Sequence, residues 1–264
     1  RVKSIPFKNV SKYLKGLSSL FMPVRFLSAL RKFYPAQRFD LIISPTPPIT
    51  FAGLISKIKK LYNAKFYLIL RDIFPQNAVD LNFFRKEGLY YRYFRAIEKK
   101  YYKLADNIGC MSQGNIDYVL RHNPYLTPDK LHILRNFQKL YSGSELQPII
   151  IREKYDLGNN FIVVFGGNMG KPQQLENVLE LAKRCMEHKN VRFLLLGEGV
   201  EMDKIARKVA EDNIENIIIR KSIKKEDYQD LISTCDLGLI SLHRDFTIPN
   251  IPSKILDYLN VGIP

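Results

Sequence analysis

The sequence is poor in the residues that build disulfides and metal centres. Its three cysteines, Cys110, Cys185 and Cys235, lie far apart and form no CxxC pair. Its four histidines show no metal-ligand spacing, so we expect neither a disulfide scaffold nor a metal site. This cysteine usage favours a reducing compartment. No run of about 18 uninterrupted apolar residues predicts a transmembrane helix.

Acidic residues are scarce in the first half of the chain. Residues 1–145 hold 25 Lys and Arg against 9 Asp and Glu, whereas residues 146–264 hold 16 against 17. The net charge of +15 therefore belongs to the first half. One-sided positive charge indicates a polyanionic partner, either nucleic acid or an anionic membrane surface. We find no basic helix-turn-helix, RNP-like strand or zinc module, and we therefore expect no nucleic-acid partner.

Short apolar strands alternate with amphipathic helices, which predicts parallel sheets covered by helices on both faces. A stretch rich in serine and glycine, 138–148, interrupts this alternation and has the composition of a linker. We predict an α/β protein with two Rossmann-like, doubly wound parallel-sheet domains that face each other across a cleft. The first domain would cover 1–140, the linker 141–152 and the second domain 153–264.

The order of the expected strands and helices shows which loops could bind a ligand. The strands are expected at 39–43, 65–70, 107–111, 131–134, 161–165, 192–196, 216–219 and 237–241. The helices are expected at 50–62, 86–104, 113–122, 174–188, 200–212, 225–234 and 252–260. Because ligands of open parallel sheets bind beyond the carboxyl ends of the strands, the loops that follow the strands are the candidate sites.

The stretch 165–171, Phe-Gly-Gly-Asn-Met-Gly-Lys, is the most informative motif. It follows a β-branched run and precedes a helical pattern that begins near Gln173. Glycines let backbone N–H groups approach an anion, and a helix N-terminus adds partial positive charge. The motif therefore predicts a phosphate site, with a plain strand-to-helix turn as the alternative. The residues of this predicted site are Gly166, Gly167, Asn168, Met169, Gly170 and Lys171.

Three further loops of the second half are candidates for nucleotide contacts. Gly197 and Glu198 make a tight turn, and backbone groups at Ser222 and Ile223 could read a planar base. Near the end of the chain Lys254 lies three residues before Asp257 on one helix face. That carboxylate could hold a ribose diol while the lysine meets phosphate, and a surface ion pair is the alternative.

Four polar residues follow strands of the first half and are candidates for the acceptor side: Arg71, Asp72, Ser112 and Asn136. Asp72 could orient an acceptor hydroxyl, although a helix cap or a salt bridge with Arg71 explains it equally well. Ser112 and Asn136 fit turn-forming or capping roles better than catalytic ones.

These motifs, taken in order, resemble the family 4 retaining glycosyltransferases of the GT-B fold. The likeness is greatest to the branch that builds O-antigen and capsular polysaccharides, which includes aminosugar transferases. The residues that carry it in the second half are Phe165–Lys171, Leu196–Gly199, Pro252–Lys254 and Asp257–Leu259. Those of the first half are Leu41–Pro48, Leu70–Pro75, Ala105–Ser112 and Leu134–Phe137.

The resemblance implies transfer of a sugar, an N-acetylated hexose, from a UDP-linked donor to a lipid-linked or saccharide acceptor. The anomeric configuration would be retained, and neither metal nor cofactor would be needed. Lys171 would neutralise the diphosphate and would form the catalytic set with Asp72 and Asp257. The role belongs to bacterial cell-surface polysaccharide biosynthesis.

The chain departs from the family pattern at one motif and at both ends. Asp257 stands at the second glutamate of the family's E-x7-E motif, but Pro249 occupies the first position. Backbone groups around Thr247–Asn250 would replace the missing glutamate. Asn250 and Ser253 are also expected among the donor-binding residues. The family's first strand and glycine loop are not found after Arg1, and a further strand and helix would follow Pro264. We expect an internal piece of a longer protein, with both domains incomplete.

Two basic stretches of the first half suggest where a membrane would bind. Within 12–32, apolar residues recur at helical spacing among lysines and arginines, and 90–103 mixes tyrosines with cations. The apolar residues of the first stretch are Leu14, Leu17, Leu20, Phe21, Val24, Leu27 and Leu30. We expect a cytoplasmic protein bound peripherally to the inner face of the plasma membrane. Helices that pack on the first sheet with solvated basic faces are the alternative.

Two other functions are compatible with the same scaffold. A nucleotide-sugar epimerase would need more carboxylates and histidines in its cleft than this chain offers. A non-catalytic partner in a polysaccharide-assembly complex would explain the departures at Pro249 and Asp257.

Overall fold

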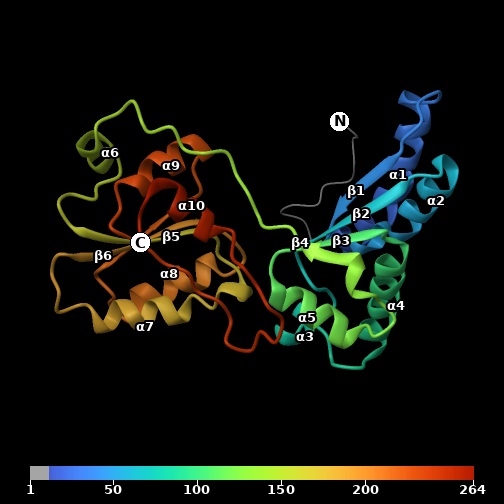
Figure 1. Ribbon diagram of the computed structural model, residues 1–264. Helices are drawn as coiled ribbons and strands as arrows, with labels where there is room; N and C mark the ends of the chain where they lie inside the picture. The colour runs from blue at the N-terminus through green and yellow to red at the C-terminus, as the bar shows by residue number, and fades with distance from the viewer. Residues whose placement is uncertain (1–11) are drawn as a thin grey trace. The chain divides into compact units, whose positions relative to one another are not determined.

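The computed structural model describes residues 12–264, in two compact units (Figure 1). The first unit runs to Arg135 and includes the separate segment Thr247–Asn250. The second unit consists of Asn136–Phe246 and Ile251–Pro264. The expectation about a missing strand after Arg1 lies outside the described residues.

The first unit is built on a parallel sheet of four strands in the order β1-β2-β3-β4. Its strands are β1 (Leu41–Pro45), β2 (Lys65–Leu70), β3 (Asn107–Cys110) and β4 (Leu131–Ile133). Its α-helices are α1 (Lys12–Phe33), α2 (Ala52–Tyr62), α3 (Gln76–Asp80), α4 (Leu89–Leu104) and α5 (Gln113–His122), with 3-10 turns η1 (Ile49–Phe51) and η2 (Pro128–Lys130). Each strand pairs with its neighbour in sequence, so the described part of this sheet shows no reversal of strand order.

Aromatic and apolar side chains hold α4 against the centre of this sheet. Phe66 of β2 is fully buried, and its ring lies 5.3 Å from that of Tyr101. The Tyr101 hydroxyl donates a 2.8 Å hydrogen bond to Oγ of Ser44, at the end of β1. A buried hydroxyl needs such a partner, so this bond fixes α4 relative to the strand ends.

The second unit contains a parallel sheet in the order β7-β6-β5-β8. Its strands are β5 (Phe161–Asn168), β6 (Val191–Glu198), β7 (Ile217–Arg220) and β8 (Leu237–Gly238). Its α-helices are α6 (Pro148–Lys154), α7 (Glu176–Arg184), α8 (Met202–Glu211), α9 (Lys225–Ser233) and α10 (Lys254–Val261), with the 3-10 turn η3 (Lys171–Gln173). The strand order reverses between β5 and β8, and the crevice beyond their carboxyl ends is where such sheets bind ligands.

Alternate residues of β5 enter two separate cores, one on each face of the sheet. Ile162 and Val164 pack in a cluster with α9 and α10. Val163 and Phe165 pack on the other face with α7 and α8. In Figure 1 these two pairs of helices lie on opposite sides of β5 and β6. Burial on both faces explains why the strand is apolar at every position rather than alternating.

The predicted α/β class with two parallel sheets is confirmed, with four strands in each sheet. The reversal of strand order that defines a doubly wound sheet is seen, among the described residues, in the second unit. Two helices, α3 and α6, were not expected, and α6 begins inside the stretch predicted to be a linker. Pro148 starts α6 at a position where proline is favoured. The stretch at 12–32 is helical, but the side chains of Leu14, Leu17 and Leu20 lie outside the described residues. Within the described chain, we find no helix with the length and apolar character to cross a bilayer.

Candidate functional site

Glycines at the carboxyl ends of β5 and β6 let the two backbones approach closely. Gly167 lies within β5 and pairs in register with Gly197. A Cβ atom at Gly197 would collide with the Gly167 carbonyl oxygen, and one at Gly199 would collide with the Met169 carbonyl oxygen. Gly167 also has φ +127°, which disfavours any side chain. Backbone packing therefore requires part of this glycine pattern whether or not a ligand binds.

At least three of the five backbone amides at 166–170 are hydrogen-bonded within the chain, in addition to the ladder that joins 166–168 to β6. The bonds run from Gly166 N to the Tyr258 hydroxyl (3.3 Å), from Met169 N to Glu198 O (2.8 Å) and from Gly170 N to Gln173 Oε1 (3.2 Å). A phosphate at this strand end would depend more on charged side chains than the sequence motif indicates.

Lys171 lies in the 3-10 turn η3, not at the start of a long helix. Gln174 then adopts a left-handed conformation with φ 42°, and α7 begins at Glu176 instead of near Gln173. The dipole of α7 therefore starts one turn beyond the glycines, so its field at 166–170 is weaker than the sequence predicts.

A second cation, Lys254 at the start of α10, lies against the end of β5. Its Nζ atom is 4.8 Å from the centre of the Phe165 ring, a cation–π contact. The same Nζ would be 3.3 Å from a Cβ atom at Gly167, so the glycine leaves room for the ammonium group. Burial lowers the pKa of Lys254 below its usual value, and the nearby Asp257 opposes this. A partly desolvated ammonium interacts strongly with any anion that reaches it.

Asp257 lies on the same helix, one turn after Lys254. Burial raises the pKa of its carboxyl group, and Lys225, a hydrogen bond with the Gln138 side chain and Lys254 oppose the shift. Gln138 also donates to the Leu256 carbonyl at 2.7 Å. Two lysines and an amide thus offset part of the cost of burying this carboxylate.

Two tyrosines that the sequence reasoning did not single out support the strand end. The Tyr258 hydroxyl lies 3.1 Å from the carbonyl oxygens of both Val164 and Leu239, and it accepts from Gly166 N. The Tyr228 hydroxyl lies against Gly166 and is buried, with no hydrogen-bond partner among the described residues. Burial raises the pKa of both hydroxyls. Both tyrosines thus contact Gly166. They come from helices distant in sequence, so the contacts are seen only in the folded structure.

The chain that follows β8 returns to the turn after β5. His243 N donates to the Pro172 carbonyl at 2.8 Å, and Arg244 N donates to Gln174 Oε1 at 2.9 Å. The switch point of the sheet therefore brings an exposed arginine to the turn that contains Lys171. Sequence reasoning missed both residues, because β8 is only two residues long and leaves the path beyond it unspecified.

The remaining predicted donor residues are divided between the two units. Glu198 ends β6 beside Asn168, and Ser222 and Ile223 follow β7, where Ile223 packs on the core. Ser253 precedes α10 and is exposed. Pro249 and Asn250 belong to the first unit.

Asp72 of the first unit lies in a loop that Thr46 organises. The Thr46 hydroxyl donates to the Asp72 carbonyl at 3.0 Å and accepts from Arg71 N at 3.1 Å. Burial raises the pKa of the Asp72 carboxyl group, and Arg71 opposes this shift. No other contact in the described structure assigns Asp72 to an acceptor, so its acceptor-side role stays a prediction.

Ser112 and Asn136, the other acceptor-side candidates, lie in different units. Ser112 caps α5: its Oγ accepts from Asn115 N at 3.2 Å and donates to Asn115 Oδ1 at 2.9 Å. This is the capping role expected of a serine at that position.

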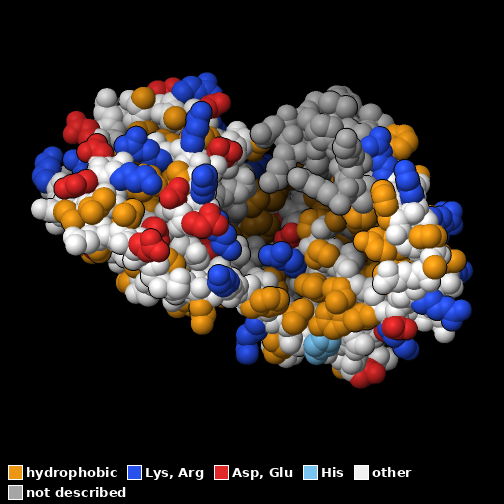
Figure 2. All heavy atoms as spheres, turned by 90° about the horizontal axis from the view of Figure 1, so that it is seen from above, with side chains coloured by type: hydrophobic (Ala, Val, Ile, Leu, Met, Phe, Trp, Pro, Cys, Tyr) orange, Lys and Arg blue, Asp and Glu red, His pale blue; other side chains and the backbone are white. Residues whose placement is uncertain are grey.

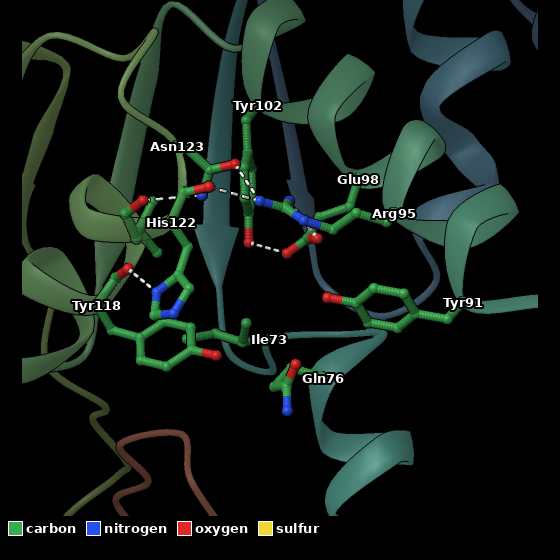
Figure 3. A pocket seen from close by; sticks show the side chains of 10 residues that line it. Ile73, Gln76, Tyr91, Arg95, Glu98, Tyr102, Tyr118, His122 and Asn123 are labelled. Atoms are coloured by element: carbon green, nitrogen blue, oxygen red, sulfur yellow. Dashed lines mark hydrogen bonds and ion pairs between the residues drawn. The ribbon is translucent and has the colours of Figure 1, made fainter. Parts of the chain in front are cut away.

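A small cavity of the first unit lies among α3, α4 and α5 (Figure 3). Arg95 donates to Glu98 at 2.6 Å and to Asn123 Oδ1 at 2.8 Å, and the Tyr102 hydroxyl donates to Glu98 at 2.8 Å. Burial raises the pKa of Glu98, and Arg95 is the main opposing influence. With a volume of about 30 Å³, the cavity has room for about two water molecules. It is a satisfied polar cluster of the core and is too small for a sugar.

No three His, Cys, Asp or Glu side chains gather as a metal site in the part of the chain that the structure describes. Among the charged residues near the carboxyl end of β5, Lys171, Arg244 and Lys254 are cations, and Glu198 and Asp257 are anions. They are suited to an anionic ligand that also carries hydroxyl groups.

Curated relatives of the chain are glycosyltransferases. The chain is 23% identical over 256 residues to the probable glycosyltransferase WbjE of Pseudomonas aeruginosa, covering 94% of this chain and 62% of WbjE. It is 24% identical over 252 residues to the putative colanic acid biosynthesis glycosyl transferase WcaI of Escherichia coli, covering 92% of this chain and 59% of WcaI. The chain thus spans less than two thirds of each relative. No protein-family profile matches it.

Solved structures share the fold. Anabaena HepE in complex with UDP-glucose matches with a TM-score of 0.66 and 16% identity, covering 85% of this chain and 58% of HepE. WaaG, a glycosyltransferase involved in lipopolysaccharide biosynthesis, matches with a TM-score of 0.59 and 14% identity, covering 94% of this chain and 76% of WaaG. The chain, with its two four-stranded parallel sheets, therefore has the fold of the GT-B glycosyltransferases.

Proposed function

We propose that the protein transfers a sugar from a nucleoside diphosphate to an acceptor in cell-surface polysaccharide biosynthesis. The observation that carries the proposal is the placement of the Lys254 ammonium against Gly167, at the end of β5. This position lies at the switch point of a sheet whose structural relatives include HepE in complex with UDP-glucose. A UDP-linked donor is therefore the first ligand to test.

Charge stabilisation on the departing diphosphate is the central chemical requirement of this reaction. Lys254 and Lys171 would neutralise the diphosphate, and Arg244 would add a third cation near the same turn. Because Lys254 is held against Phe165 and Gly167 before the bond breaks, it would favour the charged transition state with little reorganisation cost. Asp257 would hold the ribose hydroxyls, and Asp72 would orient the acceptor hydroxyl.

The proposal extends to the stereochemistry of the transfer, the donor sugar and the acceptor. We propose retention of configuration, independence of metal ions and cofactors, and an N-acetylated hexose as the transferred sugar, on the family resemblance in the motifs. The acceptor would be a lipid-linked saccharide, which fits WcaI as a colanic acid biosynthesis enzyme. An epimerase or a non-catalytic partner is less favoured, because the named relatives are transferases.

An anionic membrane surface is the proposed partner of the first unit, where a lipid-linked acceptor would be found. Figure 2 shows hydrophobic side chains beside lysines and arginines on this unit. At the start of α4, Leu89 is 84% exposed and Tyr90 is 73% exposed. Arg85 and Arg92 are exposed close to them in sequence. Exposed apolar side chains next to cations are typical of surfaces that bind anionic lipid.

The donor site is tested by calorimetric titration with UDP and by transfer from UDP-sugars to a lipid-linked saccharide fraction. Lys171→Ala should bind UDP about 10-fold more weakly, as expected for loss of a charge-assisted contact, and should lose most transfer. The matched control is Lys183→Ala on α7, whose ammonium pairs with Glu180 and Asp212 on the surface. Equal turnover in the two variants would contradict the role of Lys171 in diphosphate binding.

A further inference from the structure

The segment Thr247–Asn250 belongs to the first unit, although its neighbours in sequence belong to the second. The chain leaves the second unit after Phe246 and re-enters it at Ile251. We call these four residues the strap. The chain therefore passes from one unit to the other at three places: 135–136, 246–247 and 250–251.

Asp80, at the end of α3, binds the first residue of the strap. Its carboxylate accepts from Thr247 N at 2.8 Å and from Thr247 Oγ1 at 3.0 Å. It also accepts from Gln76 Nε2 at 2.8 Å. Asp80 is only 7% exposed, and a buried carboxylate needs donors of this kind. Thr247 supplies two of them, from 167 residues away.

Asn115, in the first turn of α5, binds the other end of the strap. Its Nδ2 donates to the Pro249 carbonyl at 2.9 Å, while Ser112 orients the amide by donating to Oδ1. Asn115 is 1% exposed. Between the two anchors the Ile248 side chain is buried. Two fixed polar groups and one buried apolar side chain therefore hold consecutive strap residues.

The second-unit ends of the same loop lie at the candidate donor site. On one side, Arg244 N bonds to the Gln174 side chain beyond η3. On the other, Lys254 lies against Gly167 and Phe165. The strap is thus the middle of a loop whose two ends both reach the carboxyl end of β5.

We propose that Asp80 and Asn115 are positioning residues that make the donor-side loop 244–254 move with the first unit. Rigid attachment at the strap limits where Arg244 and Lys254 can lie, because only two residues separate Arg244 from Thr247 and three separate Asn250 from Lys254. The attachment would align these cations for transfer without contributing to nucleotide contacts itself. This inference rests on the proposed function.

A purely structural role for Asp80 is the competing explanation, since its bond with Gln76 also closes α3. The chain offers a matched control for that role. Gln113 donates to Asp117 at 2.8 Å with the same spacing of four residues on α5. Asp117 is exposed, and none of its contacts involves the strap among the described residues.

Hydrogen exchange on the full chain tests the attachment without reference to activity. Asp80→Asn should speed exchange of the Thr247 amide about 10-fold or more, because a hydrogen bond to a charged acceptor is weakened. Asp117→Asn should leave that amide unchanged. Equal protection of Thr247 in the wild type and in Asp80→Asn would overturn the attachment.

Kinetics test the positioning role. Thr247→Val removes the hydroxyl at an exposed site and should lower kcat for sugar transfer about 10-fold, with UDP affinity unchanged within about 2-fold. Thr247→Ser keeps the hydroxyl and should restore kcat. Equal kcat in Thr247→Val and wild type, or an equal loss in Thr247→Ser, would overturn the positioning role. Absence of UDP binding by the wild type would instead refute the proposed function, and the exchange result would still decide the attachment.

Discussion

The Lys254 ammonium lies 4.8 Å from the centre of the Phe165 ring, a fully buried aromatic of β5. Phe165 and Gly167, two positions apart on β5, contact this cation at the point where the sheet reverses its strand order. Holding a partly buried ammonium there costs stability, because burial disfavours the charged form. No ion pair of Lys254 is found among the described residues, so an anion that binds here would offset this cost.

Lys254→Met should weaken UDP binding at least about 10-fold while leaving thermal stability equal or higher. The loss follows from removal of a partly desolvated cation, and the stability follows because methionine needs no solvation at this position. Calorimetry and thermal unfolding measure the two effects. A lower melting temperature together with unchanged UDP affinity would show that Lys254 serves packing alone.

The pH dependence of the wild type gives an independent check on the same group. The pKa of Lys254 is lowered in the folded state, so the folded protein releases this proton more readily than the unfolded chain. Stability from this group should therefore rise with pH as the ammonium loses its charge, and UDP affinity should fall over the same range. Both trends should be absent in Lys254→Met. Parallel loss of affinity with pH in the variant would assign the effect to another cation.

Tyr258 and Tyr228 both place a buried hydroxyl at Gly166, and only that of Tyr258 is hydrogen-bonded among the described residues. Comparing them tests whether these hydrogen bonds stabilise the end of β5. Tyr258→Phe removes a hydroxyl that bonds to two carbonyls and an amide, and it should cost about 1–3 kcal/mol of unfolding free energy. Tyr228→Phe removes a buried hydroxyl with no partner among the described residues, so it should be neutral or stabilising. Urea unfolding of both variants measures this difference. Similar losses in the two would mean that the Tyr258 bonds contribute little.

The alternation of strands and helices could be predicted because it depends on local patterns. β5 has an apolar residue at every position from Phe161 to Phe165, and Ser112 marks a helix start by its own chemistry. The details of the site could not be predicted, because they depend on contacts distant in sequence. The Tyr258 hydroxyl binds the Gly166 amide from 92 residues away, and Thr247 binds Asp80 from 167 residues away. No local pattern encodes either contact, so the motif at 165–171 overstated how many amides remain for a phosphate.

Gly197→Ala should destabilise the second unit and weaken UDP binding together. A methyl group there would collide with the Gly167 carbonyl oxygen, which is backbone and cannot rotate away, so β5 and β6 must separate at the site. We expect the free energy of unfolding to fall by about 2–4 kcal/mol, as for other overpacked core positions.

Gly53→Ala on α2 is the control. Nothing lies within 4 Å of its Cβ position, and alanine should stabilise that helix by about 0.5–1 kcal/mol. Denaturant unfolding with UDP titration distinguishes the two variants.

Membrane contact by the start of α4 can be tested with vesicles that contain phosphatidylserine. Leu89→Ser should reduce binding about 10-fold, because burial of a leucine side chain in the interface contributes about 1.5–3 kcal/mol. Val200→Ser in the second unit is a control of matched exposure, 83% against 84% for Leu89, and it should bind like the wild type. Raising the salt concentration should weaken binding of all three proteins, since the contribution of Arg85 and Arg92 is screened. Sedimentation with vesicles measures the bound fraction. Equal losses in the two serine variants, or binding that is insensitive to salt, would contradict a basic interfacial surface at α4.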